Sequence, residues 1–193
     1  MSILFDNYSY YIINENEFWQ IFKENRKSVF EENIEFSLNK ALTDLEKNKL
    51  IKLKQNLTNT YKLFIKITCD EKIIGWFYGK QSNEESFEMV NTGLIKEYRN
   101  KGIYKSILKE VIKLTEIEGF QKIGSHHHAN NNSVIVPKLK QGFIITGMEL
   151  DDKFGLLIRL TYYFNKTRSD INNFRIGSKK LNKDLEKYLN LWE

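Results

Sequence analysis

Apolar residues recur along this chain with two different periods, and these periods predict its secondary structure. Alternation with a period of two, rich in β-branched and aromatic residues, predicts strands, whereas apolar residues three and four positions apart predict helices. The predicted strands are Tyr8–Ile13, Tyr61–Thr68, Lys72–Lys80, Ser86–Ile95, Gln121–His126, Phe143–Leu150 and Leu156–Phe164. The predicted helices are 14–25, 43–57, Ile103–Glu118, Asn131–Lys140 and Ser178–Trp192.

The order of these elements predicts a mixed α/β domain over residues 1–164. Strand Ser86–Ile95, helix Ile103–Glu118 and strand Gln121–His126 follow one another, as in a crossover unit, so the two strands should be parallel. Residues 165–173 read as a linker before the last helix, whose apolar stripe must be buried. It packs either on the domain or on a second subunit of a homodimer, and the pattern does not decide between them.

The junction between strand Ser86–Ile95 and the next helix has the composition of an anion-binding loop. Backbone N–H groups at a helix N-terminus lack internal partners and lie at the positive end of the helix dipole. Arg99 and Lys101 add charge there, and Gly102 permits a close approach of the backbone to a ligand. Neither the Walker phosphate loop nor the Gly-x-Gly-x-x-Gly dinucleotide motif is present. A phosphate or pyrophosphate is the expected ligand.

Two motifs in this half of the chain resemble those of the GNAT N-acetyltransferase superfamily. Arg99-x-x-Gly102-x-Tyr104 is similar to the acetyl-CoA loop Arg/Gln-x-x-Gly-x-Gly/Ala. Asn131 opens a helix, and Gly142-Phe143 follow it at the interval that the family shows. The resemblance covers about residues 63–164. It implies a mixed α/β (α+β) fold, in which a twisted mixed sheet flanked by helices is splayed between Ser86–Ile95 and Gln121–His126.

The resemblance also implies an activity and a set of binding residues. The activity is acetyl transfer from acetyl-CoA to a primary amine of a small molecule or a peptide, by direct attack in a ternary complex. The pantetheine arm would bind along the exposed strand edge and the pyrophosphate in the loop. The residues implied are Thr92 and Leu94 for the arm, Arg99, Asn100, Lys101, Gly102, Ile103 and Tyr104 for the pyrophosphate, and Asn131 for the pantetheine region.

Lys138 departs from the family pattern, because the family often has a tyrosine there as general acid. Lys138 is either a proton donor or an ordinary surface charge of its helix. Glu88, on the strand beside the splay, is a candidate general base, and its alternative is an exposed carboxylate. His126 and His128 are further catalytic candidates, since alternate strand residues share a face. Adjacent histidines are poorly placed as zinc ligands, so no metal site is expected.

Composition bears on the partners, the disulfide bonds and the location of the protein. The net charge of +5 is modest and diffuse, which suits an anionic cosubstrate and argues against nucleic acid as a partner. Cys69 is the single cysteine, so no internal disulfide can form. No signal peptide or membrane span is visible, so we expect a cytoplasmic protein without a membrane partner.

The acceptor of the acetyl group is not identified by the sequence. Trp19, Phe30 and Phe36 are candidate walls of its pocket, although most aromatic residues of this region should belong to the core. Two other functions stay open: an acyl-CoA-binding module without turnover, and an interaction or nucleic-acid-binding protein.

Overall fold

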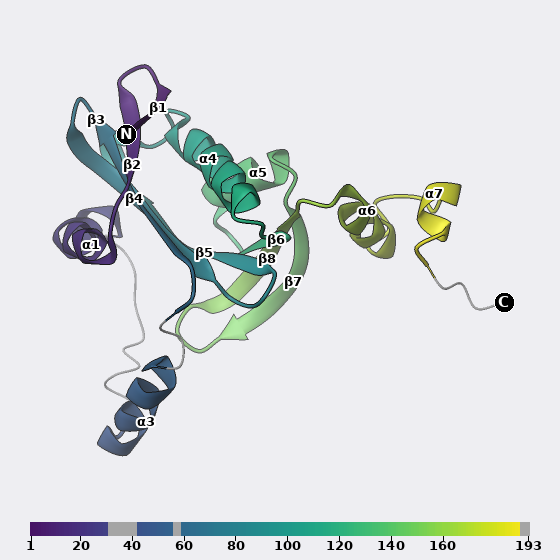
Figure 1. Cartoon of the computed structure of the whole chain (residues 1–193), viewed down its shortest axis with the longest axis horizontal. Coiled ribbons are helices and arrows are strands. Elements are labelled where there is room, and N and C mark those ends of the chain that lie inside the picture. Colours follow the sequence, from purple (N-terminus) through teal and green to yellow (C-terminus); the bar gives the residue numbers. More distant parts are fainter. Residues whose placement is uncertain (31–41, 56–58, 190–193) are drawn as a thin grey trace.

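The computed structural model describes residues 1–30, 42–55 and 59–189, and it contains an eight-stranded mixed sheet (Figure 1). The strand order is β1-β2-β3-β4-β5-β6-β8-β7. The strands are β1 (Ser2–Phe5), β2 (Tyr8–Ile12), β3 (Lys62–Cys69), β4 (Lys72–Gln81), β5 (Ser86–Leu94), β6 (Lys122–His128), β7 (Ile144–Asp151) and β8 (Gly155–Tyr163). The helices are α1 (Glu15–Val29), α3 (Asp44–Gln55), α4 (Ile103–Ile117), α5 (Asn132–Lys140), α6 (Lys166–Arg175) and α7 (Lys183–Glu186), and a 3-10 turn spans Lys96–Tyr98.

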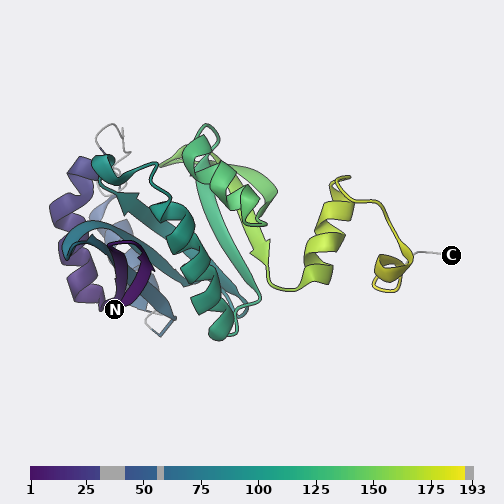
Figure 2. The ribbon, with the colours of Figure 1, turned by 90° about the horizontal axis from the view of Figure 1, so that it is seen from above.

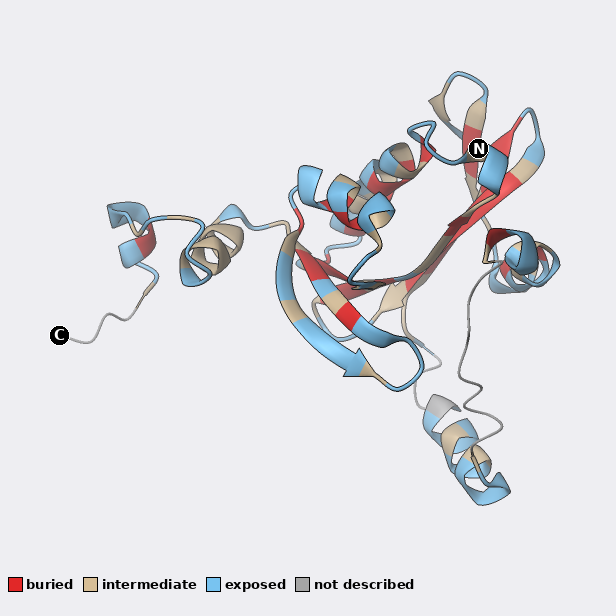
Figure 3. Cartoon of the chain, turned by 180° about the vertical axis from the view of Figure 1, so that it is seen from behind, coloured by how far each residue is buried: buried red, intermediate tan, exposed pale blue. Residues whose placement is uncertain are grey.

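Helices cover both faces of the sheet, with α4 and α5 on one side and α1 on the other (Figure 1). The larger core contains the buried face of α4 and the apolar residues of β3 to β6 that meet it. Phe18, Ile21 and Val29 of α1 form a smaller core with Phe64 and Trp76. Buried residues are concentrated along the central strands and on the helix faces that meet them (Figure 3).

The sequence patterns locate α1 and α3 through their capping residues. The Oδ1 atom of Asn14 accepts a hydrogen bond from the backbone N–H of Glu17 at 2.9 Å, as expected for an N-cap. Thr43 and Glu46 form a reciprocal capping box at the start of α3. Leu45, Ile51 and Leu53 of α3 are nevertheless exposed, and this helix projects away from the sheet (Figure 1).

Strands β5 and β6 are parallel, as the crossover order predicts, and they separate partway along their length. Their pairing runs from Ser86 opposite Lys122 to Met89 opposite Ser125. Beyond that pair β5 continues to Leu94 and β6 to His128 as the strands diverge. Within the described chain, no strand pairs with this edge of β5 after Met89. The predicted splay is therefore confirmed.

The C-terminal segment differs from its predicted structure. Residues 165–173, predicted as a linker, lie largely in α6, because Asn165 caps it by accepting from the backbone N–H of Arg168 at 3.1 Å. The predicted helix Ser178–Trp192 is reduced to the single turn α7, and residues 190–193 lie outside the described chain. Strand β1 was not predicted. Helices α6 and α7 extend away from the sheet (Figure 2). Arg168 ties α6 to the turn before β5 through a two-pronged ion pair with Glu85.

No helix in the described ranges is both long enough and apolar enough to cross a membrane.

Candidate active site

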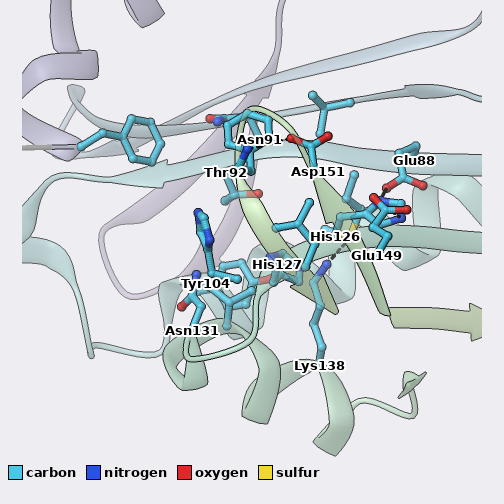
Figure 4. Close-up of a pocket in the computed structure, with 17 residues that line it drawn as sticks. Glu88, Asn91, Thr92, Tyr104, His126, His127, Asn131, Lys138, Glu149 and Asp151 are labelled. Carbon is cyan, nitrogen blue, oxygen red and sulfur yellow. Dashed lines mark hydrogen bonds and ion pairs between the residues drawn. The ribbon is translucent and has the colours of Figure 1, made fainter. Parts of the chain in front are cut away.

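A cavity of about 400 Å³ lies where β5 and β6 diverge (Figure 4). Its walls come from β5, β6, α4, α5 and the β7–β8 hairpin, together with Phe30 at the end of α1. All three catalytic candidates, Glu88, His126 and His128, line it, as do Thr92, Tyr104 and Asn131 from the predicted binding set. Phe30, one of the aromatic residues predicted to wall the acceptor pocket, lines this cavity. Trp19 packs on Phe18 and Tyr78 instead, and Phe36 lies outside the described residues.

The anion loop has the backbone conformation that an anion cradle requires. Asn100 and Gly102 both have positive φ angles, of 61° and 82°, which turn the chain sharply into α4. A Cβ atom placed on Gly102 would meet no atom within 4 Å, so the space in front of the loop is open. The first N–H groups of α4, from Ile103 and Tyr104 onward, start at this turn. The residues present therefore fit a pyrophosphate held by backbone groups.

Arg99 does not point a free charge into this loop. Its Nε atom donates to the carbonyl oxygen of Leu94 at 3.0 Å, and one of its terminal nitrogens donates to that of Val29 at 2.6 Å. The side chain thus joins the end of α1 to the end of β5. Lys101 lies over the ring of Tyr98, with its Nζ atom 5.2 Å from the ring centroid. Both side chains thus keep their charge beside the loop but are held by other contacts, and the carbonyl of Leu94, a residue predicted to bind the arm, already has a partner.

Glu88 and His126 form a hydrogen-bonded pair inside the cavity. The Nδ1 atom of His126 lies 2.9 Å from Oε1 of Glu88, and Nε2 lies 3.7 Å from Oε1 of Glu149 on β7. Gly124 makes this contact feasible, because any Cβ atom there would collide with the Glu88 carboxylate. Burial raises the pKa of Glu88, while the neighbouring His126, Lys138 and Arg159 oppose that rise. A carboxylate in this setting is a better proton acceptor than an exposed one.

The other two histidines differ sharply from His126. His127 points to the opposite face of β6, its Nε2 atom is buried without a hydrogen-bond partner in the described structure, and burial lowers its pKa to about 3. It is therefore a neutral imidazole at physiological pH. His128 is exposed and rests edge-on against Phe154. The sequence singled out His126 and His128, but the structure gives a carboxylate partner to His126.

Lys138 is almost completely buried, with 1% of its surface exposed, so its interpretation as a surface charge is wrong. The side chain extends from α5 into the cavity (Figure 4). Its Nζ atom donates to the thioether sulfur of Met89 at 3.3 Å and lies 5.0 Å from the centroid of the Phe143 ring. Burial lowers the pKa of Lys138 to about 7, although the charge of Glu88 acts in the opposite direction. The amine is therefore half protonated near neutral pH.

Two further polar groups border the cavity. Tyr104, where the family has Gly or Ala, is half-buried, and burial raises the pKa of its phenol well above the usual range. Asn131 precedes α5, and its Oδ1 atom accepts from the hydroxyl of Ser133 at 2.7 Å. Among the described residues, no group of three or more His, Cys, Asp and Glu side chains is arranged to hold a metal ion.

No family model and no curated protein sequence matches this chain. Solved structures do match it. A GNAT family acetyltransferase from Elizabethkingia anophelis with acetyl-CoA bound is 17% identical, with a TM-score of 0.53 over 83% of this chain and 100% of that one. The ribosomal-protein-S5-alanine acetyltransferase from Vibrio fischeri is 16% identical, with a TM-score of 0.60 over 86% and 98%.

The ribosomal-protein-S18-alanine N-acetyltransferase from Escherichia coli is 12% identical, with a TM-score of 0.59 over 82% of this chain and 94% of that one. Similarity at these identities concerns the fold, which is here a mixed sheet flanked by helices (Figure 1). The chain therefore has the GNAT acetyltransferase fold.

Proposed function

We propose that this protein transfers an acetyl group from acetyl-CoA to a primary amine. The observation that carries the proposal is the free edge of β5, which joins an anion cradle at one end to a cavity with a carboxylate–histidine pair at the other. GNAT-fold proteins with acetyl-CoA bound support the choice of cosubstrate.

The length of that free edge suits the cosubstrate. Residues 90–94 extend over about 16 Å at the usual rise of a strand. A pantetheine arm is an extended chain with two amide groups, so it can add to such an edge as a short peptide would. With the pyrophosphate at the N-terminus of α4, the thioester would lie near Met89, where β5 and β6 separate. Val90, Thr92 and Asn131 border this path.

The residues at that point have suitable roles. An amine acceptor enters largely as an ammonium ion and must lose a proton before it attacks. The Glu88–His126 pair would take that proton, and Glu149 at the cavity mouth adjoins the pair. Lys138, half protonated near pH 7, would donate a proton to the departing sulfur. No covalent help from the protein is needed, since positioning accounts for much of the rate.

The lining of the cavity indicates the chemical class of the acceptor. Phe30 and Phe154 contribute aromatic surface, and Glu149 and Asp151 contribute negative charge that favours a cationic amine. Neighbouring structures include enzymes named for spermidine and for the alanine of ribosomal proteins. Both a small-molecule amine and a peptide amine therefore remain within the proposal.

Replacement of the proposed base tests the chemistry. Glu88→Gln keeps the shape of the side chain but removes its basicity, so we expect kcat to fall about 100- to 10,000-fold with little change in acetyl-CoA affinity. Asp152→Asn is the matched control, because Asp152 is an exposed carboxylate of the adjacent hairpin. Unchanged turnover in Glu88→Gln would remove Glu88 from the mechanism.

Calorimetric titration with acetyl-CoA and with CoA tests the cosubstrate. Gly102→Glu would place a carboxylate in the cradle and should abolish binding. Gly102→Ala controls for the strain of a side chain at a φ angle of 82°, and it should bind measurably. Absence of binding to the wild-type protein would refute the proposal, whereas binding without turnover on a broad amine panel would favour an acyl-CoA-binding module.

A further inference from the structure

Lys138 is a second amine within the cavity, besides any acceptor that enters it. Its Nζ atom contacts a thioether and an aromatic ring, and no carboxylate of the described chain lies within ion-pair distance of it. An ammonium group in such surroundings lacks the partners that normally compensate burial. Its neutral form is correspondingly favoured, and the pKa of about 7 expresses this.

A neutral primary amine is a nucleophile toward thioesters. Most lysines are protected from this reaction because they are protonated in water. Lys140, two residues further along α5, is exposed and illustrates the contrast. Lys138 differs from Lys140 in two ways. It is almost completely removed from water, and its side chain is directed into the cavity.

The position of Lys138 matches the place where an acetyl thioester would lie. Met89, which receives its hydrogen bond, belongs to the last residue pair before β5 and β6 separate. A pantetheine arm that follows the free edge of β5 from the anion cradle ends at this same point. The thioester carbon would then have two amines beside it when an acceptor is bound, and Lys138 alone when none is.

We propose that Lys138 is a self-acetylation site, which takes the acetyl group from bound acetyl-CoA when no acceptor occupies the cavity. The inference rests on the proposed function. The lone pair of Nζ forms a bond to the thioester carbon, the carbon–sulfur bond breaks, and CoA leaves as its thiol with a proton lost from Nζ. No further reactant is needed. The product is an uncharged amide.

Acetylation of Lys138 would regulate the site in which it occurs. The amide can no longer supply a proton to the sulfur, and its acetyl group occupies space in the cavity that Glu88 and His126 also line. Turnover should therefore decline as the modification accumulates. An abundant acceptor would protect the protein by competing for the same acetyl group.

The test is incubation of the full chain with acetyl-CoA alone at pH 8, followed by intact-mass measurement and peptide mapping. We expect one added acetyl group, located on Lys138. Lys138→Arg should gain none, Lys140→Arg should behave as wild type, and Gly102→Glu should lose the modification with its cosubstrate. Circular dichroism establishes that each variant is folded, and Lys138→Met replaces Lys138→Arg if the latter is not.

The outcomes separate this inference from the proposed function. If calorimetry shows acetyl-CoA binding but Lys138 stays unmodified after many hours, self-acetylation is refuted and the proposed function stands. Equal labelling of Lys138 and exposed lysines would also refute it, because a built-in site is selective. If acetyl-CoA does not bind at all, both proposals fail together.

Discussion

Lys138 should make the folded protein less stable at neutral pH, and its replacement by methionine measures by how much. The pKa of Lys138 is about 7 in the folded protein, against 10.5 for a lysine in water. Between these values the unfolded chain holds a proton that the folded chain has lost, so stability rises with pH over this interval. Lys138→Met has a similar length and no charge, so it removes this dependence.

The two pKa values set the size of the effect. Because folding lowers the pKa of Lys138, it reduces the free energy of unfolding by about 4 kcal/mol at pH 7 and by about 1 kcal/mol at pH 10. We therefore expect Lys138→Met to be more stable than wild type by up to about 4 kcal/mol at pH 7. The advantage should shrink by about 3 kcal/mol at pH 10.

Urea unfolding at pH 7, 8.5 and 10 gives these differences, with the fluorescence of the buried Trp76 as one signal. Lys140→Met is the matched control, because it removes a lysine of the same helix whose side chain is exposed. A stability difference between Lys138→Met and wild type that is the same at pH 7 and pH 10 would refute the reasoning. Such a result would mean that Lys138 stays charged in the fold, and it would also weaken the case for self-acetylation.

Two other predictions concern the packing of strand β5 and the anchoring of helix α6. Gly93→Ala should lower the unfolding free energy by about 1–3 kcal/mol, because its Cβ atom would lie 2.6 Å from the buried ring of Trp76, whereas Gly147→Ala, in open space, should change little in the same urea assay. Glu85→Gln should speed hydrogen exchange in α6 by removing the ion pair with Arg168. Arg168 chiefly, and Lys122 to a smaller extent, lower the pKa of Glu85 to about 2. The ion pair therefore stabilises α6 fully above pH 4.5, and the wild-type helix should loosen as pH falls toward 2. Exchange in α6 that is insensitive to both changes would show that the pair does not anchor the helix.

The sequence predicted the parts of the fold that depend on local patterns. Among the described residues, the apolar pattern located seven of the eight strands, and Asn14 located the start of α1. The crossover order correctly predicted parallel pairing of β5 and β6. These features follow from residues near one another in the chain, which is why a single sequence reveals them.

The sequence was less informative where distant residues decide the outcome. Arg99 was predicted to bind the pyrophosphate, and the pattern did not reveal that it also donates to the carbonyl of Val29, 70 positions away. The sequence left Lys138 as either a proton donor or a surface charge, because lysines are rarely buried, and only the divergence of β5 from β6 reveals its cavity. Residues 165–173 read as a linker because they are polar, yet Glu85, in the turn between β4 and β5, anchors their helix.

The charges of Arg99 and Lys101 beside the loop determine how anion binding there should depend on salt. Dissolved ions screen attraction between exposed charges much more than they weaken short hydrogen bonds from aligned peptide groups. Arg99 and Lys101 keep their charges and are exposed, because neither a carbonyl oxygen nor an aromatic ring neutralises a cation. Affinity for a diphosphate should thus fall as the salt concentration rises, while the contribution of the N–H groups of α4 should persist, so that cosubstrate binding responds in part to the ionic composition of the surroundings.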